Sequence, residues 1–151
     1  MAEKPKKTNP YHDFKPVKYV EQMSEEGRYM EATVVLSALL ETALSVAVEK
    51  RVRETNPEFP EETIGKLIDR NSFETNIDLA VCLGVVDKSV YDRLRSFKGE
   101  RNSLVHSFAD WRSKTHKHLR SVVESGTLLF AEIFALAKQA EKTGDRDSTG
   151  A

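Results

Sequence analysis

A long apolar segment in the first third of the chain restricts the folds that the chain can adopt. Ser24 has the character of an N-cap, and Glu25 and Glu26 follow it in the first turn, where the helix dipole favours carboxylates. We therefore expect one helix from Ser24 to about Arg53. Its apolar residues recur at helical spacing: Tyr29, Thr33, Val35, Leu36, Leu39, Leu40, Ala43, Val46, Ala47 and Val48. An apolar face of this width predicts a helix that is covered on more than one side.

The remainder of the chain contains signals for shorter helices. Ser72 and Asp87 have the character of N-caps, and Gly84 that of a helix end. Gly99 falls inside a predicted helix, where it marks a bend or the close approach of another backbone. The helices that we expect cover residues 17–23, 61–70, 73–83, 88–108 and 114–142, with a turn over 109–113.

These elements predict an all-α protein, an antiparallel bundle of four to five helices. The 7 glycines and 5 prolines are too few for a sandwich or barrel of many short strands. The boundaries that we expect are a flexible arm over residues 1–16, a helical domain over 17–142 and a disordered polar tail over 143–151.

The sequence also suggests where the protein works. We find no apolar run near the roughly 18 residues that cross a bilayer, and no apolar core behind the Lys-rich N-terminus. We therefore expect neither a membrane span nor a secretory signal. Cys82 is the single cysteine and forms no internal disulfide, which favours a cytoplasmic protein. The ligand spacings of zinc and iron–sulfur sites are missing, so we predict no metal and no cofactor.

Positive charge is concentrated in one segment. Residues 93–120 contain eight Lys and Arg residues against two carboxylates, although the whole chain has a formal net charge of −1. Such a surplus is typical of surfaces that bind phosphate or nucleic acid. Solvated helix faces also carry many Lys and Arg residues, so the charge alone leaves both interpretations open.

Within the basic segment, Arg101, Asn102 and His106 combine a fixed cation, an amide and a group that titrates near neutral pH. Asn102 and His106 are four residues apart and share one helix face. Arg101 and His106 are separated by about 140° around an ideal helix. They converge only through the reach of the arginine, a bend near Gly99, or a neighbouring helix or subunit.

These groups suit metal-free cleavage of RNA. His106 would activate the ribose 2′-OH or protonate the leaving 5′-oxygen. Arg101 would stabilise the charge of a phosphorane-like transition state, and Asn102 would orient His106 or donate to a phosphate oxygen. One histidine does not easily act as both acid and base, and a symmetric dimer would supply a second copy.

Structural interpretations stand beside this chemical one. An Arg-x4-His spacing also arises by chance in chains of this size. Arg101 could pair with a carboxylate of another helix, and Glu41 in the long apolar helix is a candidate partner. Asn102 and His106 could be polar groups whose hydrogen bonds are satisfied within the bundle. Trp111 could stack on a base, but it is more typical of a residue that plugs the end of a bundle.

The stretch from Lys98 to Ser107 resembles the Arg-x4–6-His motif of the HEPN superfamily. The segment Glu25–Leu44 is similar to the first long helix of such domains. Ser72–Val86 resembles the apolar helix and Leu-Gly turn that precede the motif in several branches, among them regulators that are similar to the mannitol operon repressor. The resemblance covers roughly residues 20–140.

This resemblance implies a helical bundle that dimerises, with two Arg-x4-His motifs facing each other in a shared cleft. Many members of the superfamily are ribonucleases of toxin–antitoxin, phage-defence or RNA-processing systems. By this comparison Arg101 and His106 would be catalytic and Asn102 supportive. The partners implied are RNA or another nucleic acid, a second copy of the chain, and a separate antitoxin protein, because this chain has no attached nucleotidyltransferase domain.

Further residues of the basic segment are candidates for substrate contact: Lys98, Ser107, Arg112, Lys114 and Lys117. His116 and His118 lie about 200° apart on a helix, so they do not chelate one metal but extend a basic surface.

The alternative to an RNase is a non-catalytic regulator of transcription that binds nucleic acid or protein through the same fold. A third interpretation gives Arg101 and His106 a purely structural role at a dimer interface.

Overall fold

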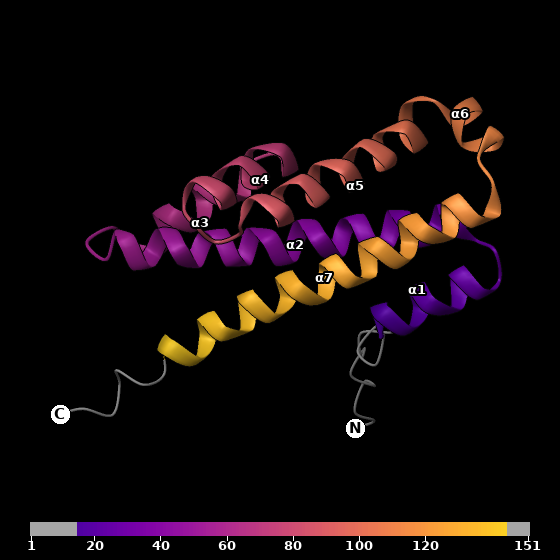
Figure 1. Ribbon diagram of the computed structural model, residues 1–151. Helices are drawn as coiled ribbons and strands as arrows, with labels where there is room; N and C mark the ends of the chain where they lie inside the picture. Colours follow the sequence, from indigo (N-terminus) through magenta and orange to yellow (C-terminus); the bar gives the residue numbers. More distant parts are fainter. Residues whose placement is uncertain (1–14, 145–151) are drawn as a thin grey trace, which may run out of the picture.

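The computed structural model describes residues 15–144, apart from the side chains of Val105, Phe108 and residues 140–144. Within these residues the protein is all-helical, as expected, but it contains seven helices rather than four or five (Figure 1). The helices are α1 (Pro16–Glu25), α2 (Tyr29–Thr55), α3 (Glu61–Asp69), α4 (Phe73–Cys82), α5 (Lys88–His106), α6 (Phe108–Ser113) and α7 (His116–Gly144).

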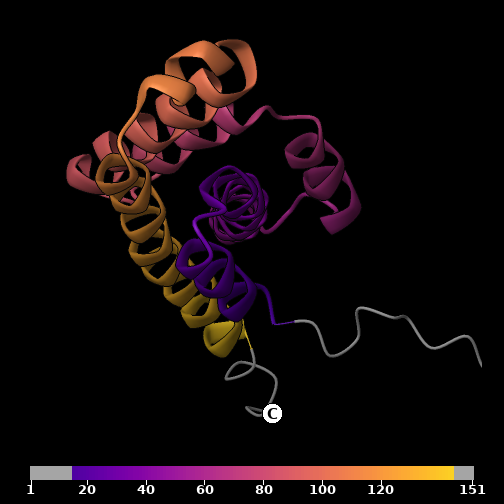
Figure 2. The ribbon, with the colours of Figure 1, turned by 90° about the vertical axis from the view of Figure 1, so that its right-hand side faces the viewer.

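The long apolar helix α2 lies at the centre of the structure, and other helices surround it (Figure 2). It packs against α1, α3, α4, α5 and α7. Its buried side chains are Tyr29, Ala32, Thr33, Leu36, Ser37, Leu40, Ala43, Leu44, Ala47 and Val48. The expectation of a helix covered on several sides is therefore confirmed. Val46 does not fit this expectation, because 42% of its surface is exposed.

Helix α2 is also long and apolar enough to cross a membrane when it is judged by length and composition alone. Our expectation that no run approaches this length is therefore wrong, since residues 32–48 contain a single charged side chain, Glu41. Half of the most apolar stretch of α2 is buried inside the structure. Burial among five other helices is a sufficient physical reason for this composition.

The start of the central helix differs from the sequence prediction. Ser24 lies in the last turn of α1, and α2 begins only at Tyr29. Gly27 has a φ of +75°, the left-handed conformation that glycine adopts without strain. The Arg28 N–H donates to Met23 O at 2.8 Å and the Gly27 N–H donates to Ser24 O at 3.1 Å. This Schellman motif ends α1, so one predicted helix start is in fact a helix end.

The helix boundaries in the middle of the chain are confirmed. Ser72 Oγ accepts a hydrogen bond from the Thr75 N–H, and Asp87 Oδ1 accepts one from the Val90 N–H at 2.9 Å. Both side chains thus satisfy a backbone donor in the first turn of α4 or α5. Gly84, with a φ of +69°, ends α4 in a second Schellman motif.

Residues 108–113 form the short helix α6 rather than the turn that we expected. Ser107 separates α5 from α6, and its carbonyl accepts a hydrogen bond from the Asp110 N–H at 2.9 Å. Trp111 is only 4% exposed, and its Nε1 donates to Glu100 O at 3.1 Å. The buried indole holds α6 against α5, which confirms its predicted place as a plug at the end of the bundle.

Helices α2 and α7 run in the same direction, whereas α5 runs opposite to both (Figure 1). Tyr29 at the start of α2 lines a hollow with His116 at the start of α7. Ala47, near the other end of α2, lines a hollow with Leu136 of α7. The predicted antiparallel arrangement therefore describes α5 with α7 but not α2 with α7, because the chain returns through α5 and α6 before α7 begins.

Two glycines inside helices differ in their surroundings. Gly126 of α7 lies against two other helices: a Cβ there would be 2.6 Å from Phe97 Cε2 of α5 and 3.2 Å from Leu36 Cδ1 of α2. Gly99 marks neither a bend nor a close approach, because α5 continues through it and a Cβ there would meet no atom within 4 Å.

The ends of the helical region lie close to the predicted boundaries. Helix α1 begins at Pro16, one residue before the predicted start, and α7 continues to Gly144, two residues past the predicted end. The remainder of the predicted arm and tail, residues 1–14 and 145–151, lies outside the described residues.

Candidate functional site

Arg101 lies on the inner side of α5 and reaches α2. Its Nη2 is 3.6 Å from Glu41 Oε1, and its Nη1 donates to Asn102 Oδ1 at 3.4 Å. The side chains of Arg101 and Glu41 are 36% and 39% exposed. The pairing of Arg101 with Glu41, which the sequence offered as one alternative, is therefore present. A carboxylate and an amide thus lie beside the guanidinium at long distances, and its other N–H donors are available.

His106 is the last residue of α5, and it is exposed. Leu104, which is 6% exposed, anchors this last turn in the core. Among the side chains that the structure describes, no hydrogen bond or ion pair connects His106 with Arg101 or Asn102. Both residues lie in the continuous helix α5, where five positions correspond to about 140° around the axis.

The hollow next to the Arg101–Glu41 pair is acidic. It has a volume of about 370 Å³, lies between α2 and the α3–α4 region, and its wall includes Glu41, Glu49 and Asp69. Asn76 also lines it, is 5% exposed, and accepts a hydrogen bond from Asn71 through its Oδ1. Glu41 pairs with Arg101 and Glu49 with Arg53, but no lysine or arginine is among the residues that line the hollow, so it offers no net attraction to a polyanion.

Three cations of the first half of the basic segment are used in ion pairs between helices. Arg93 Nη1 is 2.7 Å from Glu132 Oε2 of α7. Arg95 Nη1 is 2.6 Å from Glu74 Oε1, and Lys98 Nζ is 3.0 Å from Glu74 Oε2, both on α4. Lys98, predicted to contact substrate, therefore contacts a carboxylate of its own chain.

The cluster of Glu74, Lys98 and Arg95 predicts a dependence of stability on pH. Hydrogen bonds from Lys98 and Arg95 lower the pKa of Glu74 in the folded protein. A carboxyl group with a lowered pKa stabilises the fold above its unfolded pKa, and this contribution is lost as the pH falls through the folded value. We expect Glu74→Gln to lower the melting temperature at neutral pH, and the difference from the parent to shrink as the pH falls and Glu74 becomes protonated. Melting curves of the two proteins from neutral to acidic pH test it, and a constant difference contradicts it.

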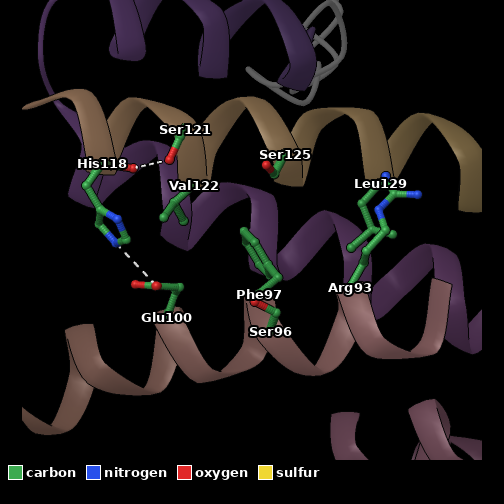
Figure 3. Close-up of a pocket in the computed structure, with 9 residues that line it drawn as sticks. All are labelled: Arg93, Ser96, Phe97, Glu100, His118, Ser121, Val122, Ser125 and Leu129. Carbon is green, nitrogen blue, oxygen red and sulfur yellow. Dashed lines mark hydrogen bonds and ion pairs between the residues drawn. The ribbon is translucent and has the colours of Figure 1, made fainter. Parts of the chain in front are cut away.

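A polar groove lies between α5 and α7 (Figure 3). His118 Nε2 is 3.2 Å from Glu100 Oε1, and Ser121 Oγ donates to the His118 carbonyl at 2.6 Å. The floor is apolar and includes Phe97, which is 5% exposed. His118 and His116 line different hollows, so the two side chains lie on different surfaces of the protein.

The cations of the second half of the basic segment gather at the end of the bundle where α6 and α7 meet. The side chains of Arg112, Lys114, Lys117 and Arg120 are all exposed. No carboxylate with a described side chain lies within ion-pairing distance of these four. They line hollows that also include Tyr29 and His116. We call these four residues the α6–α7 cations.

The predicted site residues thus fall into two groups. Arg101, Asn102, His106 and Ser107 lie along the last turns of α5 and the junction after it. Arg112, Lys114 and Lys117 lie on α6 and the start of α7. Sequence reasoning did not find the roles of Glu74 and Glu132, because a contact between distant helices leaves no local signal. The signal for Glu41 was a carboxylate in an otherwise apolar run.

Comparison with protein-family models, curated proteins and solved structures finds no match to this chain.

Proposed function

We propose that the protein is a metal-independent endoribonuclease of the HEPN type that acts as a homodimer. One observation supports this above the others. An exposed imidazole, His106, ends helix α5, which also carries Arg101, and the Arg101 guanidinium lies beside Glu41 of α2 and Asn102. The imidazole is accessible to substrate, and the guanidinium has free N–H donors with which to stabilise charge in a transition state.

The proposed reaction is an internal transfer at phosphorus. His106 accepts the proton of the ribose 2′-OH as the 2′-oxygen bonds to the adjacent phosphorus. Arg101 binds the non-bridging oxygens and stabilises the charge that develops on them. The bond from phosphorus to the 5′-oxygen then breaks, and this oxygen receives a proton. The products are a 2′,3′-cyclic phosphate and a free 5′-hydroxyl.

The second proton transfer is the reason for a dimer in this proposal. A general base and a general acid are needed at opposite sides of the phosphorus. Within one described chain, no hydrogen bond or ion pair joins His106 and Arg101, whose positions are about 140° apart around α5. A twofold axis near the end of α5 would place His106 of each copy beside the motif of the other.

The test is an RNA digestion in EDTA with two substrates. We expect a single-stranded RNA to be cut, with 2′,3′-cyclic phosphate and 5′-hydroxyl ends, and the 2′-deoxy analogue of the same sequence to remain intact. Product ends are identified by mass spectrometry. Cleavage of the deoxy analogue contradicts the mechanism, and so does the absence of cleavage from about pH 5 to about pH 9.

A second candidate function is a non-catalytic regulator that binds nucleic acid. It is favoured by the Arg101–Glu41 pair, because a guanidinium already partnered by a carboxylate is less available to a phosphate. In that case the protein retains RNA binding, cuts no RNA, and is insensitive to substitution of His106. The proposed roles as a toxin with a separate antitoxin protein, or in phage defence, apply only if the protein cleaves RNA.

A further inference from the structure

We propose that the hollows between the α1–α2 turn, α6 and the start of α7 bind the phosphate backbone of single-stranded RNA. This binding surface is separate from the Arg101–His106 motif. This inference depends on the proposed function in one respect, namely that the polyanion bound by the protein is RNA. It concerns where the strand is held, and it is independent of whether the strand is cut.

Two adjoining hollows form this surface. One has a volume of about 540 Å³ and is lined by Lys117 and Arg120; the other has a volume of about 300 Å³ and is lined by Arg112 and Lys114. Tyr29 and His116 line both hollows, and their rings meet edge to face with centroids 5.7 Å apart. The ring contact connects the start of α2 to the start of α7, and the two hollows adjoin at these shared residues.

The charge of this surface is positive. The four α6–α7 cations are exposed and have no carboxylate partner among the described side chains. Arg28, which also lines the surface, is neutralised by Glu31, since its Nε is 3.3 Å from Glu31 Oε1. Glu124 is the one further carboxylate in the walls of the two hollows. The surface therefore keeps a surplus of positive charge at neutral pH, which attracts phosphate.

Two of the other hollows described above lack such a surplus. The hollow between α2 and the α3–α4 region is lined by Glu41, Glu49 and Asp69. In the α5–α7 groove, Arg93 pairs with Glu132 and His118 lies against Glu100. A polyanion therefore finds net attraction at the α6–α7 end and not at these two places.

The geometry favours an extended strand over a single phosphate. The four cations are distributed over nine residues, from Arg112 to Arg120, and over two open hollows, whereas one phosphate is bound by converging donors. Tyr29 and Trp111 are each 4% exposed, so they offer no free face on which a base could stack. His116 is the one exposed aromatic ring in these walls, so most of the recognition is of the phosphate backbone.

The position of α6 connects this surface to the motif. Trp111 Nε1 donates to Glu100 O, the residue before Arg101 in the chain, and this bond fixes α6 against the last turns of α5. Figure 1 places α6, the end of α5 and the start of α7 at one end of the bundle. A strand that lies on the α6–α7 cations can therefore continue over α6 toward the exposed His106.

The test measures binding in a His106→Ala background, so that cleavage does not interfere. A labelled single-stranded RNA is titrated with protein at several salt concentrations between about 50 and about 300 mM, and its fluorescence anisotropy gives the dissociation constant. The double variant Lys117→Gln, Arg120→Gln removes two proposed phosphate contacts. We expect the slope of log K against log salt to become shallower by about 1.4, because each contact to a single strand contributes about 0.7.

The control is Lys66→Gln, Arg70→Gln, which removes the same formal charge from the α3 region, at the other end of the bundle, where Lys66 pairs with Glu62. We expect the control to keep the slope of the parent. Equal slopes for the parent and the Lys117→Gln, Arg120→Gln variant overturn the proposal, and so does a protein that binds no RNA.

A competition experiment tests the preference for an extended strand. Displacement of the RNA by inorganic phosphate, at the same concentration of phosphate groups as the RNA supplies, overturns this preference. Failure of the RNA digestion assay, in contrast, refutes the catalytic proposal and leaves these binding results as they stand.

Discussion

Replacement of His106 by alanine is expected to reduce the rate of RNA cleavage by a factor of about 100 to about 10,000, the usual contribution of a positioned acid or base. The side chain is exposed at the end of α5, and it makes no hydrogen bond within the described part of the chain. The melting temperature should therefore stay close to that of the parent. Single-turnover cleavage rates and thermal melts of the same preparations separate loss of chemistry from loss of fold.

A mixing experiment adds a control that a structural role for His106 would not predict. If two copies of the imidazole serve one phosphodiester, a dimer of one parent chain and one His106→Ala chain lacks one of them. An excess of the variant should then suppress cleavage by the parent after subunit exchange. A variant with the activity of the parent, or a mixture whose activity is the simple average, contradicts the proposed mechanism.

The second large effect is expected on stability, from Gly126→Val. The Cβ would lie 2.6 Å from Phe97 Cε2 and 3.2 Å from Leu36 Cδ1, and both neighbours are almost fully buried. The Phe97 ring must therefore shift toward the α5–α7 groove that it lines, or α5 and α7 must separate. Overpacking of this kind costs about 1 to about 3 kcal/mol, and the two methyl groups of valine place the result at the upper end of that range. Urea unfolding of the parent and the variant measures the difference.

The matched control is Gly99→Ala on α5. A Cβ at Gly99 meets no atom within 4 Å, and the backbone there is helical. Alanine should therefore increase the free energy of unfolding by about 1 kcal/mol, the difference in helix propensity. A lower free energy of unfolding for Gly126→Val and a higher one for Gly99→Ala would show that packing around each glycine, and not the loss of a glycine itself, decides the outcome. A destabilised Gly99→Ala variant contradicts the reading of α5 as an unstrained helix.

The helices were largely predictable because their signals are local. Ser72, Gly84 and Asp87 each define a helix end through one or two bonds to residues three to five positions away. The same locality explains the error at Ser24. A serine followed by two glutamates is typical of a helix start, and only the conformation of Gly27 three residues later makes this segment a helix end.

The candidate site was less predictable, because its character depends on contacts between distant helices. The sequence grouped all eight cations of residues 93–120 into one basic segment. In the fold, Glu74 and Glu132 neutralise those at the start of α5, and Glu41 partners Arg101. The carboxylates come from α2, α4 and α7, and no periodicity in the sequence indicates that they meet α5. The cations of α6 and α7 remain available for a ligand.

The shared direction of α2 and α7 has an electrical consequence. Peptide units add along a helix to roughly half a positive elementary charge at its start. Two long helices side by side in opposite directions would cancel this polarity, but α2 and α7 begin together at the hollow of Tyr29 and His116. Helices α1 and α5 end at this same place, and the negative ends of their dipoles offset most of this polarity. The attraction of this end for anions therefore depends on its side chains, and replacement of the α6–α7 cations should remove most of it.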